Sequence, residues 1–323
     1  MPDTVLQMSG VHAARKFLEK YLAPTRLVRA PSLDYASGAQ VSLKLEIENP
    51  TATFKVRGAL NAVHHRAQPS RLEGIVTSST GNHGAAIAYA AREMNIPARI
   101  YLPEKPNPVK RDRIAQLGAD IVEAGRDLEE SRQHAAKFAR ARGWPLIVDV
   151  DDPSIAAGAA TIACEILEQA PTTDVIVIPV GDSNLIRGVA FAAKQIRPAV
   201  RIIGVQAEKA PAYYQSWKER RALNTESADT IADGLATRTT TDDNVRQLIE
   251  LVNDVRLVSD DEMLRAIVHL LLNEHTVAEP AGAAATAALL KSGKEFAGKN
   301  VVLLVTGANI APDILRRAVQ AVS

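Results

Sequence analysis

The stretch Glu48-Asn49-Pro50-Thr51-Ala52-Thr53-Phe54-Lys55-Val56-Arg57-Gly58-Ala59 decides the fold of this chain. It places one lysine, Lys55, between an extended apolar run at 41–47 and the start of an apolar helix at 59–63. Burial disfavours the charged form of a lysine and lowers its pKa. A lysine held partly neutral is the kind that forms a Schiff base. The stretch therefore indicates a reactive amine, although taken alone a surface lysine at a helix start is the simpler interpretation.

Two other segments favour the reactive interpretation. Ser78-Ser79-Thr80-Gly81-Asn82-His83-Gly84 and Pro179-Val180-Gly181-Asp182-Ser183-Asn184-Leu185 each follow a strand-like run and open a helix-like run. Exposed backbone N–H groups at a helix start bind anions. A helix cap and a tight turn would explain the glycines of these segments, but not the complete sets of polar residues.

Composition limits the classes of protein to which the chain can belong. Its 323 residues suffice for a large core, which we expect to be divided between two lobes, and its hydrophobic content of 46% is ordinary for a globular protein. A net charge of +1 argues against a nucleic-acid binder. No apolar run reaches transmembrane length, and the N-terminus lacks a signal-peptide pattern. The single cysteine, Cys164, excludes an internal disulfide and fits a reducing cytoplasm.

Strand-like and helix-like runs alternate along the chain. Strands are expected at 74–77, 99–102, 120–122, 146–148, 174–179, 201–206 and 300–305. Helices are expected at 85–94, 108–117, 128–141, 155–168, 185–196, 260–273, 281–291 and 311–322. Such alternation predicts an α/β protein with mostly parallel sheets that helices cover on both faces.

The chain resembles a known family through six motifs in family order: Thr-Phe-Lys-x-Arg-Gly at 53–58, Gly-Asn-His-Gly at 81–84, the loop at 181–185, Ala232-Asp233-Gly234, Glu279-Pro280-Ala281-Gly282 and Thr306-Gly307-Ala308-Asn309. It resembles the pyridoxal-phosphate enzymes of the tryptophan-synthase β fold (fold type II), in the serine/threonine dehydratase and serine racemase branch. The resemblance runs from about Ala23 to the C-terminus. It implies a homodimer whose large lobe (1–71 and 149–323) carries an inserted small lobe (72–148), with pyridoxal 5'-phosphate between the lobes.

The resemblance also implies roles for individual residues. Lys55 would form the Schiff base and remove the Cα proton, and Asn82 would bond the ring hydroxyl of the cofactor. Phe54 and Gly234 would flank the ring, and Thr306 would face the pyridine nitrogen, which favours elimination over transamination. Glu279 would lie near the cofactor. The phosphate loop would comprise Gly181, Asp182, Ser183, Asn184 and Leu185, and the substrate loop Ser79, Thr80, Gly81 and His83.

Several positions depart from the family pattern. The phosphate loop keeps one glycine where the family usually has four, and we expect the Asp182 side chain to point away from the phosphate. Thr80 stands where racemases carry a catalytic serine; it keeps a hydroxyl on the face opposite the lysine, but its extra methyl group argues against racemisation. Gln206 and Ala212 occupy the two acidic positions of the family's cation site. A hard cation needs carboxylate oxygens, so we expect no metal there.

Acidic residues at 149–152 replace a His-Pro-aromatic segment on the substrate side. They predict either helix capping by Asp152 or recognition of a positively charged substrate side chain by Asp149 or Asp151. Arg187, where the family has a small residue, would instead serve an acidic substrate such as 3-hydroxyaspartate. The sequence leaves these alternatives open.

The expected activity is dehydration of a 3-hydroxy amino acid, such as L-threonine or L-serine, to a 2-keto acid and ammonia. One alternative is a dehydratase specific for a charged 3-hydroxy amino acid, either 3-hydroxyaspartate or a hydroxy-diaminobutyrate from hydroxyectoine degradation. Another is an amino-acid racemase with Thr80 opposite Lys55. β-Replacement is less favoured because His83 matches the dehydratases, and a cofactor-binding protein without catalysis remains open. The expected location is cytoplasmic, with an amino acid as the only ligand besides the cofactor and with no nucleic acid or membrane partner.

Overall fold

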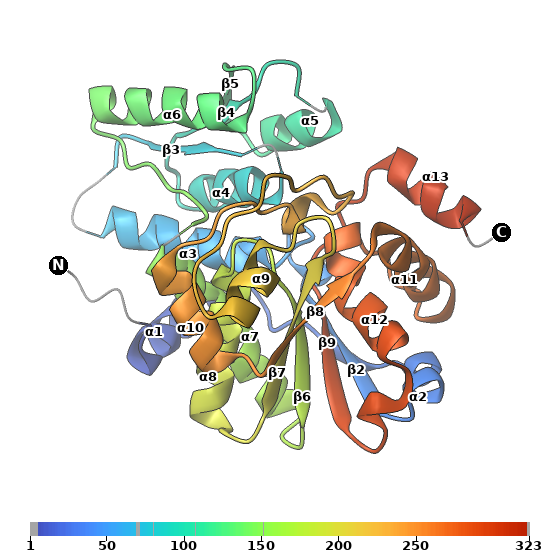
Figure 1. Cartoon of the computed structure of the whole chain (residues 1–323). Coiled ribbons are helices and arrows are strands. Elements are labelled where there is room, and N and C mark those ends of the chain that lie inside the picture. Colours follow the sequence, from blue (N-terminus) through green and yellow to red (C-terminus); the bar gives the residue numbers. More distant parts are fainter. Residues whose placement is uncertain (1–5, 69–71, 80, 107, 151, 322–323) are drawn as a thin grey trace.

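The chain forms two sheets with helices on both faces of each (Figure 1). The computed structural model describes residues 6–68, 72–79, 81–106, 108–150 and 152–321. Its strands are β1 (Leu27–Arg29), β2 (Gln40–Leu45), β3 (Ile75–Ser78), β4 (Ala98–Leu102), β5 (Asp120–Glu123), β6 (Val175–Pro179), β7 (Arg201–Ala207), β8 (Asp254–Val258) and β9 (Asn300–Val305). Its helices are α1 (Met8–Leu18), α2 (Pro31–Ser37), α3 (Lys55–Ala67), α4 (Asn82–Glu93), α5 (Pro108–Gln116), α6 (Leu128–Arg142), α7 (Pro153–Gln169), α8 (Asn184–Ile196), α9 (Ala212–Glu219), α10 (Asp242–Leu251), α11 (Asp260–Asn273), α12 (Pro280–Ser292) and α13 (Pro312–Gln320), with short 3-10 turns η1 (Glu46–Glu48), η2 (Asp233–Leu235) and η3 (Gly293–Phe296).

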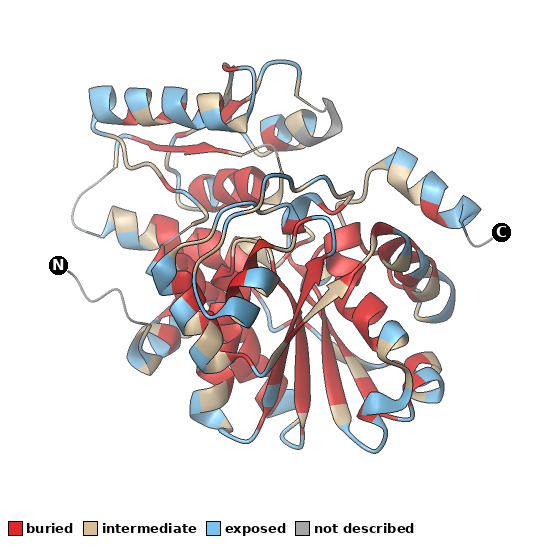
Figure 2. Ribbon diagram, viewed as in Figure 1, coloured by how far each residue is buried: buried red, intermediate tan, exposed pale blue. Residues whose placement is uncertain are grey.

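The larger sheet has the order β1-β2-β9-β6-β7-β8, and only the edge strand β1 is antiparallel to its neighbour. Strand β6 explains why this sheet is sandwiched between helices. Its residues Val175 and Val177 face one core cluster, whereas Ile176 and Ile178 face another. Because successive side chains of a strand point to opposite faces, a fully apolar strand needs cover on both sides. Figure 2 shows these strands buried beneath helices.

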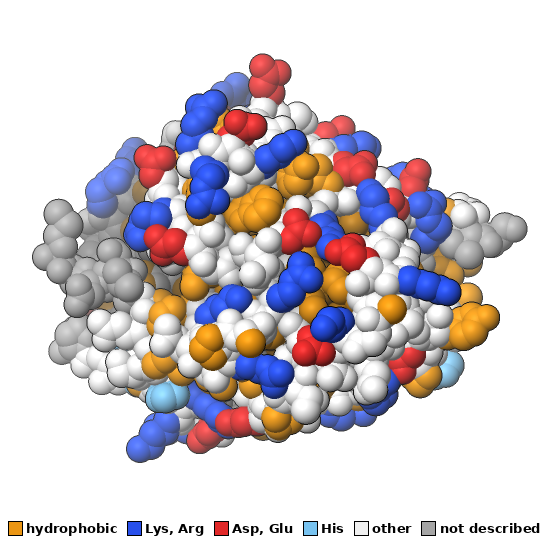
Figure 3. Space-filling model, turned by 60° about the horizontal axis from the view of Figure 1, so that its bottom comes forward, with side chains coloured by type: hydrophobic (Ala, Val, Ile, Leu, Met, Phe, Trp, Pro, Cys, Tyr) orange, Lys and Arg blue, Asp and Glu red, His pale blue; other side chains and the backbone are white. Residues whose placement is uncertain are grey.

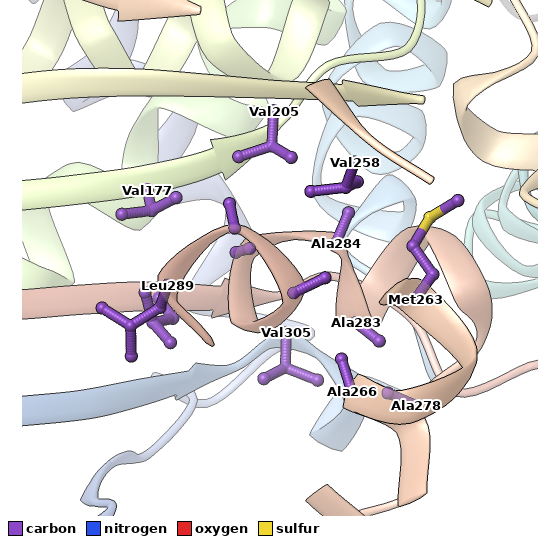
Figure 4. Packing of buried hydrophobic residues seen from close by; sticks show 14 of the residues in the cluster. Val177, Val205, Val258, Met263, Ala266, Ala278, Ala283, Ala284, Leu289 and Val305 are labelled. Atoms are coloured by element: carbon purple, nitrogen blue, oxygen red, sulfur yellow. The ribbon is translucent and has the colours of Figure 1, made fainter. Parts of the chain in front are cut away.

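Alanine brings α12 close to the larger sheet. Ala283 and Ala284 of this helix share one buried cluster with Val177, Val205 and Val305, valines of three neighbouring strands (Figure 4). At the start of the same helix, a Cβ on Gly282 would lie 2.3 Å from the carbonyl oxygen of Gly307. Small residues are therefore required where α12 meets the end of β9, next to Thr306.

The smaller sheet is parallel, with the order β3-β4-β5. Helices α4 and α5 pack on one face through Ala85, Ala88 and Ile114, and α6 packs on the other through Ala135 and Ala139. The fold class expected from the sequence is confirmed. The lobe boundaries at 72 and 148 stay a prediction that the two separate sheets support.

The structure corrects the expected elements at several points. Residues 146–148 form no strand, because only Leu146 pairs, in an isolated parallel bridge with Val76. Five elements near the N-terminus and in the second half of the chain were not expected from the sequence: α1, α2, α9, α10 and β8. The edge strand β1 was not expected either. Short or strongly polar segments of this kind are placed by tertiary packing more than by their own hydrophobic pattern.

Four charged side chains lie buried beneath the start of α3. The Arg57 guanidinium donates to both carboxylate oxygens of Glu46 (2.7 and 3.0 Å) and of Glu165 (2.5 and 3.0 Å). Lys44 Nζ donates to Glu165 Oε2 (2.5 Å). These four residues, which we call the buried charge cluster, are each less than a tenth exposed. They tie α3 to β2, η1 and α7, and so fix the backbone two residues after Lys55.

The outer surface mixes charges of both signs. Figure 3 shows lysine and arginine side chains interspersed with aspartate and glutamate over the visible face. Across the described residues, no helix combines the length and the apolar character needed to cross a membrane.

Candidate active site

Lys55 is held against the end of the larger sheet. The Phe54 amide donates to the carbonyl oxygen of Thr306 (3.0 Å), and Thr53 forms an antiparallel bridge with Gly307. Helix α3 begins at Lys55 itself, so the amine projects from the first residue of the helix. The central strand β9 therefore fixes the position of the lysine, as catalytic positioning requires.

A cleft of about 900 Å³ opens beside Lys55. Its walls come from both sheets, since α4 contributes Asn82 and His83 and the loop after β6 contributes Asp182. The residues expected at the site that line this cleft are Lys55, Ser79, Gly81, Asn82, His83, Asp149, Asp182, Gly234 and Glu279. A narrower recess next to it is lined by Phe54, Lys55, Asn82, Gly181, Asp182, Leu185, Gly234, Glu279 and Thr306.

Two expected residues lie in this region but line neither space. Ser183 Oγ contacts Tyr213 Oη (3.3 Å), and Asn184 donates its side-chain amide to the carbonyl oxygen of Asp149. Both belong to the start of α8. Thr80 and Asp151 lie outside the described residues, so their expected roles stay predictions.

Asn82 is held at both ends of its amide. Its Nδ2 donates to Glu279 Oε1 (2.7 Å), and its Oδ1 accepts from Asn309 Nδ2 (2.6 Å). Asn309 also accepts from Arg113, whose Nη2 donates to the carbonyl oxygen of Thr51 (3.3 Å). Arg113 thus links α5 of the smaller sheet to the larger one. Arg113 was not among the residues expected at the site, because an arginine in a polar helix carries no local signal of such a contact.

The Lys55 amine lies between two carboxylates. It donates to Asp149 Oδ2, and Asp182 Oδ2 lies 3.6 Å away. Burial alone lowers the pKa of Lys55, but the charges of Asp149 and Asp182 overcome that effect and raise it above its usual value. The expectation that burial keeps this lysine partly neutral is therefore wrong for the chain without a bound cofactor.

Asp182 lines the site, contrary to the expectation that its side chain points away from it. Its Oδ1 accepts from the backbone N–H of Asn184 (3.2 Å), and its other oxygen faces Lys55. Burial and the nearby Asp149 raise the pKa of Asp182 to about 7. Burial also opposes ionisation of Asp149, but Lys55 and His83 hold its pKa below the usual range. The pair therefore carries one proton at mildly acidic pH, on Asp182.

We predict that replacing Asp182 with asparagine changes how stability depends on pH. Because the pKa of Asp182 is raised to about 7 in the folded chain, the carboxyl binds a proton there at pH values where the unfolded chain, with a pKa of about 3.9, has lost it. The wild type therefore loses stability relative to Asp182→Asn as the pH rises through this window. Urea unfolding of both cofactor-free proteins at about pH 5 and about pH 8 checks this. A stability difference that stays flat with pH would contradict the proton assignment.

His83 stands at the start of α4, behind the substrate loop. Its Nδ1 lies 3.6 Å from Asp149 Oδ1, and burial lowers the pKa of His83, so the ring is neutral at neutral pH. Nearby, a Cβ on Gly84 would lie 2.7 Å from the carbonyl oxygen of Ser79. Glycine at position 84 therefore allows the loop to fold tightly over the helix start.

The expected cation site contains no carboxylate at its two key positions. Gln206 is fully buried, and its Oε1 accepts from the backbone N–H of Tyr214 (2.9 Å). Within the described ranges, no group of three or more His, Cys, Asp or Glu side chains is placed to hold a metal ion. The absence of a metal stays a prediction.

The residues present fit pyridoxal phosphate. At the loop before α8, the Asn184 N–H donates to the Asp182 carboxyl, which lines the recess. The recess offers an amide at Asn82 and a buried neutral side chain at Thr306 beside the Lys55 amine. A Cβ on Gly181 would lie 2.2 Å from the carbonyl oxygen of Gly234, so glycine is needed for the two walls of the recess to meet. Lys55 would hold the cofactor covalently, the loop its phosphate, and Asn82 its ring hydroxyl.

Comparisons with known proteins agree over most of the chain. A family profile described as pyridoxal-phosphate dependent enzyme matches residues 18–307. The L-threonine ammonia-lyase of Thermotoga maritima is 32% identical over 315 residues, which make up 98% of this chain and 78% of that protein. The L-threonine ammonia-lyase of Geobacter sulfurreducens is 33% identical over 311 residues, or 96% of this chain and 76% of that protein.

Solved structures give the same picture. Maize serine racemase superposes with a TM-score of 0.91 at 28% identity, and the match covers 98% of this chain and 97% of the racemase. The processed form of threonine deaminase isoform 2 from Solanum lycopersicum superposes with a TM-score of 0.91 at 29% identity, covering 97% and 92% of the two chains. Lyases and racemases therefore share this architecture.

Proposed function

This chain belongs to the pyridoxal-phosphate-dependent enzymes and is an ammonia-lyase of that family, and we propose that it converts a 3-hydroxy amino acid such as L-threonine or L-serine to a 2-keto acid and ammonia. The observation that carries the proposal is the position of the Lys55 amine. It opens into a cleft between the substrate loop at the start of α4 and the loop before α8. Relatives named L-threonine ammonia-lyase support threonine as the first substrate to test.

Each part of the site has one task in this proposal. Bound pyridoxal phosphate supplies a conjugated ring that accepts the electron pair left when the substrate loses its Cα proton. The Lys55 amine, which lines both the cleft and the recess, would accept that proton. Backbone N–H groups at Gly81 and the start of α4 bind the substrate carboxylate. The neutral Thr306 side chain leaves the ring nitrogen without a charged partner, which favours elimination.

The test is release of 2-keto acid and ammonia from purified, cofactor-loaded protein. The panel holds L- and D-serine, L- and D-threonine, 3-hydroxyaspartate, 3-phenylserine and 3-hydroxy-2,4-diaminobutyrate. Equal amounts of keto acid and ammonia from threonine or serine would support the proposal. Recovered substrate with scrambled Cα configuration and no ammonia would instead establish a racemase. If no amino acid of the panel released 2-keto acid and ammonia, the proposal that the protein is a dehydratase would be contradicted.

A second candidate is a dehydratase for a substrate with a positively charged side chain. The Asp149 and Asp182 carboxylates line the cleft beside Lys55, so a substrate ammonium group there would meet negative charge. Arg187 does not favour the acidic alternative, because its guanidinium donates to Ser183 Oγ (3.1 Å) and Asn184 Oδ1 (2.5 Å), residues that line neither space. The structure thus favours a cationic side chain over an anionic one among the charged substrates.

We predict that Asp149→Asn changes the substrate preference. If Asp149 recognises a cationic side chain, the variant loses roughly 10- to 100-fold in kcat/KM for 3-hydroxy-2,4-diaminobutyrate relative to threonine, since one charge-assisted contact disappears. Asp313→Asn is the matched control, because Asp313 is an exposed carboxylate on the outer rim of the same cleft. If the kcat/KM for 3-hydroxy-2,4-diaminobutyrate relative to that for threonine were unchanged in Asp149→Asn, threonine or serine would be the better assignment for the substrate.

Homodimerisation and a cytoplasmic location belong to the same proposal. Both rest on the family to which the chain belongs. Analytical ultracentrifugation of the purified protein would settle the first.

A further inference from the structure

The loop before α8 adopts a conformation that its sequence does not favour. Ser183 has φ of 78°, in the left-handed region where a side chain is disfavoured, and it directly precedes Asn184, the first residue of the helix. Such a conformation is strained for a residue other than glycine, so contacts around it must hold it in place.

Arg187 supplies two of those contacts. One turn into α8, its Nε donates to Ser183 Oγ (3.1 Å) and its Nη2 donates to Asn184 Oδ1 (2.5 Å). Its Nη1 donates to Gln247 Oε1 of α10 (3.3 Å). The guanidinium is buried, with the residue 7% exposed, and it lines neither the cleft nor the recess. It therefore supports the loop from behind.

Tyr213 completes the support from α9. Its hydroxyl donates to the carbonyl oxygen of Asp182 (3.2 Å) and contacts Ser183 Oγ (3.3 Å). Residues of α8 and α9 thus hold the Ser183 and Asn184 side chains, and Asn184 also donates to the carbonyl oxygen of Asp149. The Asn184 backbone N–H donates to the Asp182 carboxyl, so one donor at the helix start points toward a residue that lines the recess.

We propose that Arg187 is a positioning residue for the cofactor phosphate: it fixes the loop at 181–185 and places a fixed positive charge behind it. The inference rests on the proposed placement of the phosphate at this loop. A phosphate there lies beside the Asp182 carboxylate, and two negative groups repel each other. A buried guanidinium one turn away offsets that repulsion, because charges act more strongly where water is excluded.

The experiment compares pyridoxal phosphate with pyridoxal, which lacks the phosphate. Dissociation constants of both are measured by absorbance titration of the cofactor-free wild type and of Arg187→Gln, which keeps hydrogen-bonding ability but removes the charge. We expect the preference for pyridoxal phosphate over pyridoxal to fall roughly 10- to 100-fold in the variant, mostly through weaker binding of pyridoxal phosphate. Arg187→Lys, which keeps the charge, should retain more of the preference than Arg187→Gln.

The controls separate this inference from the function on which it rests. Gln247→Ala removes one partner of Arg187 but no charge, so its preference should match that of the wild type. If both ligands weaken equally in Arg187→Gln and Arg187→Lys, Arg187 is only structural and the inference is overturned. If Arg187→Gln does not fold, a wild-type preference in Arg187→Lys supports the charge, and a lost preference overturns it. A wild type that binds both ligands equally would show that the phosphate placement itself is wrong.

Discussion

Replacing Lys55 with alanine should abolish both turnover and covalent cofactor binding. Lys55 lines the cleft, and it is the residue that we propose to hold pyridoxal phosphate and to accept the Cα proton. Removing the nucleophile and the base together should lower kcat/KM for threonine or serine by roughly 10⁴-fold or more. The absorbance band of the cofactor bound to lysine should disappear after dialysis, while far-UV circular dichroism stays unchanged.

Lys218→Ala is the matched control for Lys55→Ala. It removes an exposed lysine of α9 that lines neither the cleft nor the recess, and should leave activity and absorbance as in the wild type. Ammonia release that persists in Lys55→Ala at the wild-type rate would refute the role given to this residue. Restoration of part of the activity by added small amines would support it, since a free amine can then act as the base.

Replacing Arg57 with methionine should destabilise the protein more than any surface change. The substitution leaves the Glu46 and Glu165 carboxylates buried, with Lys44 as the one remaining cation of the buried charge cluster. Removing one partner of a buried ion pair costs about 3–5 kcal/mol of unfolding free energy. Urea unfolding of the cofactor-free protein should report that loss. Because Arg57 follows Lys55 by two residues, cofactor affinity should fall as well.

Arg66→Met is the control on the same helix. Arg66 pairs with Asp152 (2.9 Å), but the Arg66 side chain is 40% exposed and Asp152 keeps its hydrogen bonds from Ser154, so the loss should be smaller than for Arg57→Met. A loss for Arg57→Met no larger than that for Arg66→Met would mean that the buried charge cluster is not needed to hold α3. Activity per folded molecule should distinguish this structural effect from a direct catalytic one.

The central part of the fold could be predicted from sequence because its signals are local. A run of five buried apolar residues in β6 is typical of a central parallel strand, and the structure confirms it. Residues 146–148 are just as apolar, but they form no strand. Only Leu146 pairs with the smaller sheet, in a single bridge to Val76. Helix α10 begins with the polar residues Asp242-Asp243-Asn244, so its sequence does not show a clear helical pattern of apolar residues at its start.

The candidate site divides in the same way. Lys55, Asn82 and Thr306 were found through short motifs, and the structure brings them to one recess. The contacts of the Lys55 amine with Asp149 and Asp182 were not predicted, because they join residues far apart in sequence that meet only when the sheets pack together. The raised pKa of Lys55 follows from those contacts and has no signature in the motif around it.

The most direct test of this account is to locate the cofactor on the chain. The protein is loaded with pyridoxal phosphate, reduced with borohydride to make the attachment permanent, digested, and analysed by mass spectrometry. The account predicts one labelled peptide, with the label on Lys55. A label on another lysine, or none in a folded protein, would contradict it.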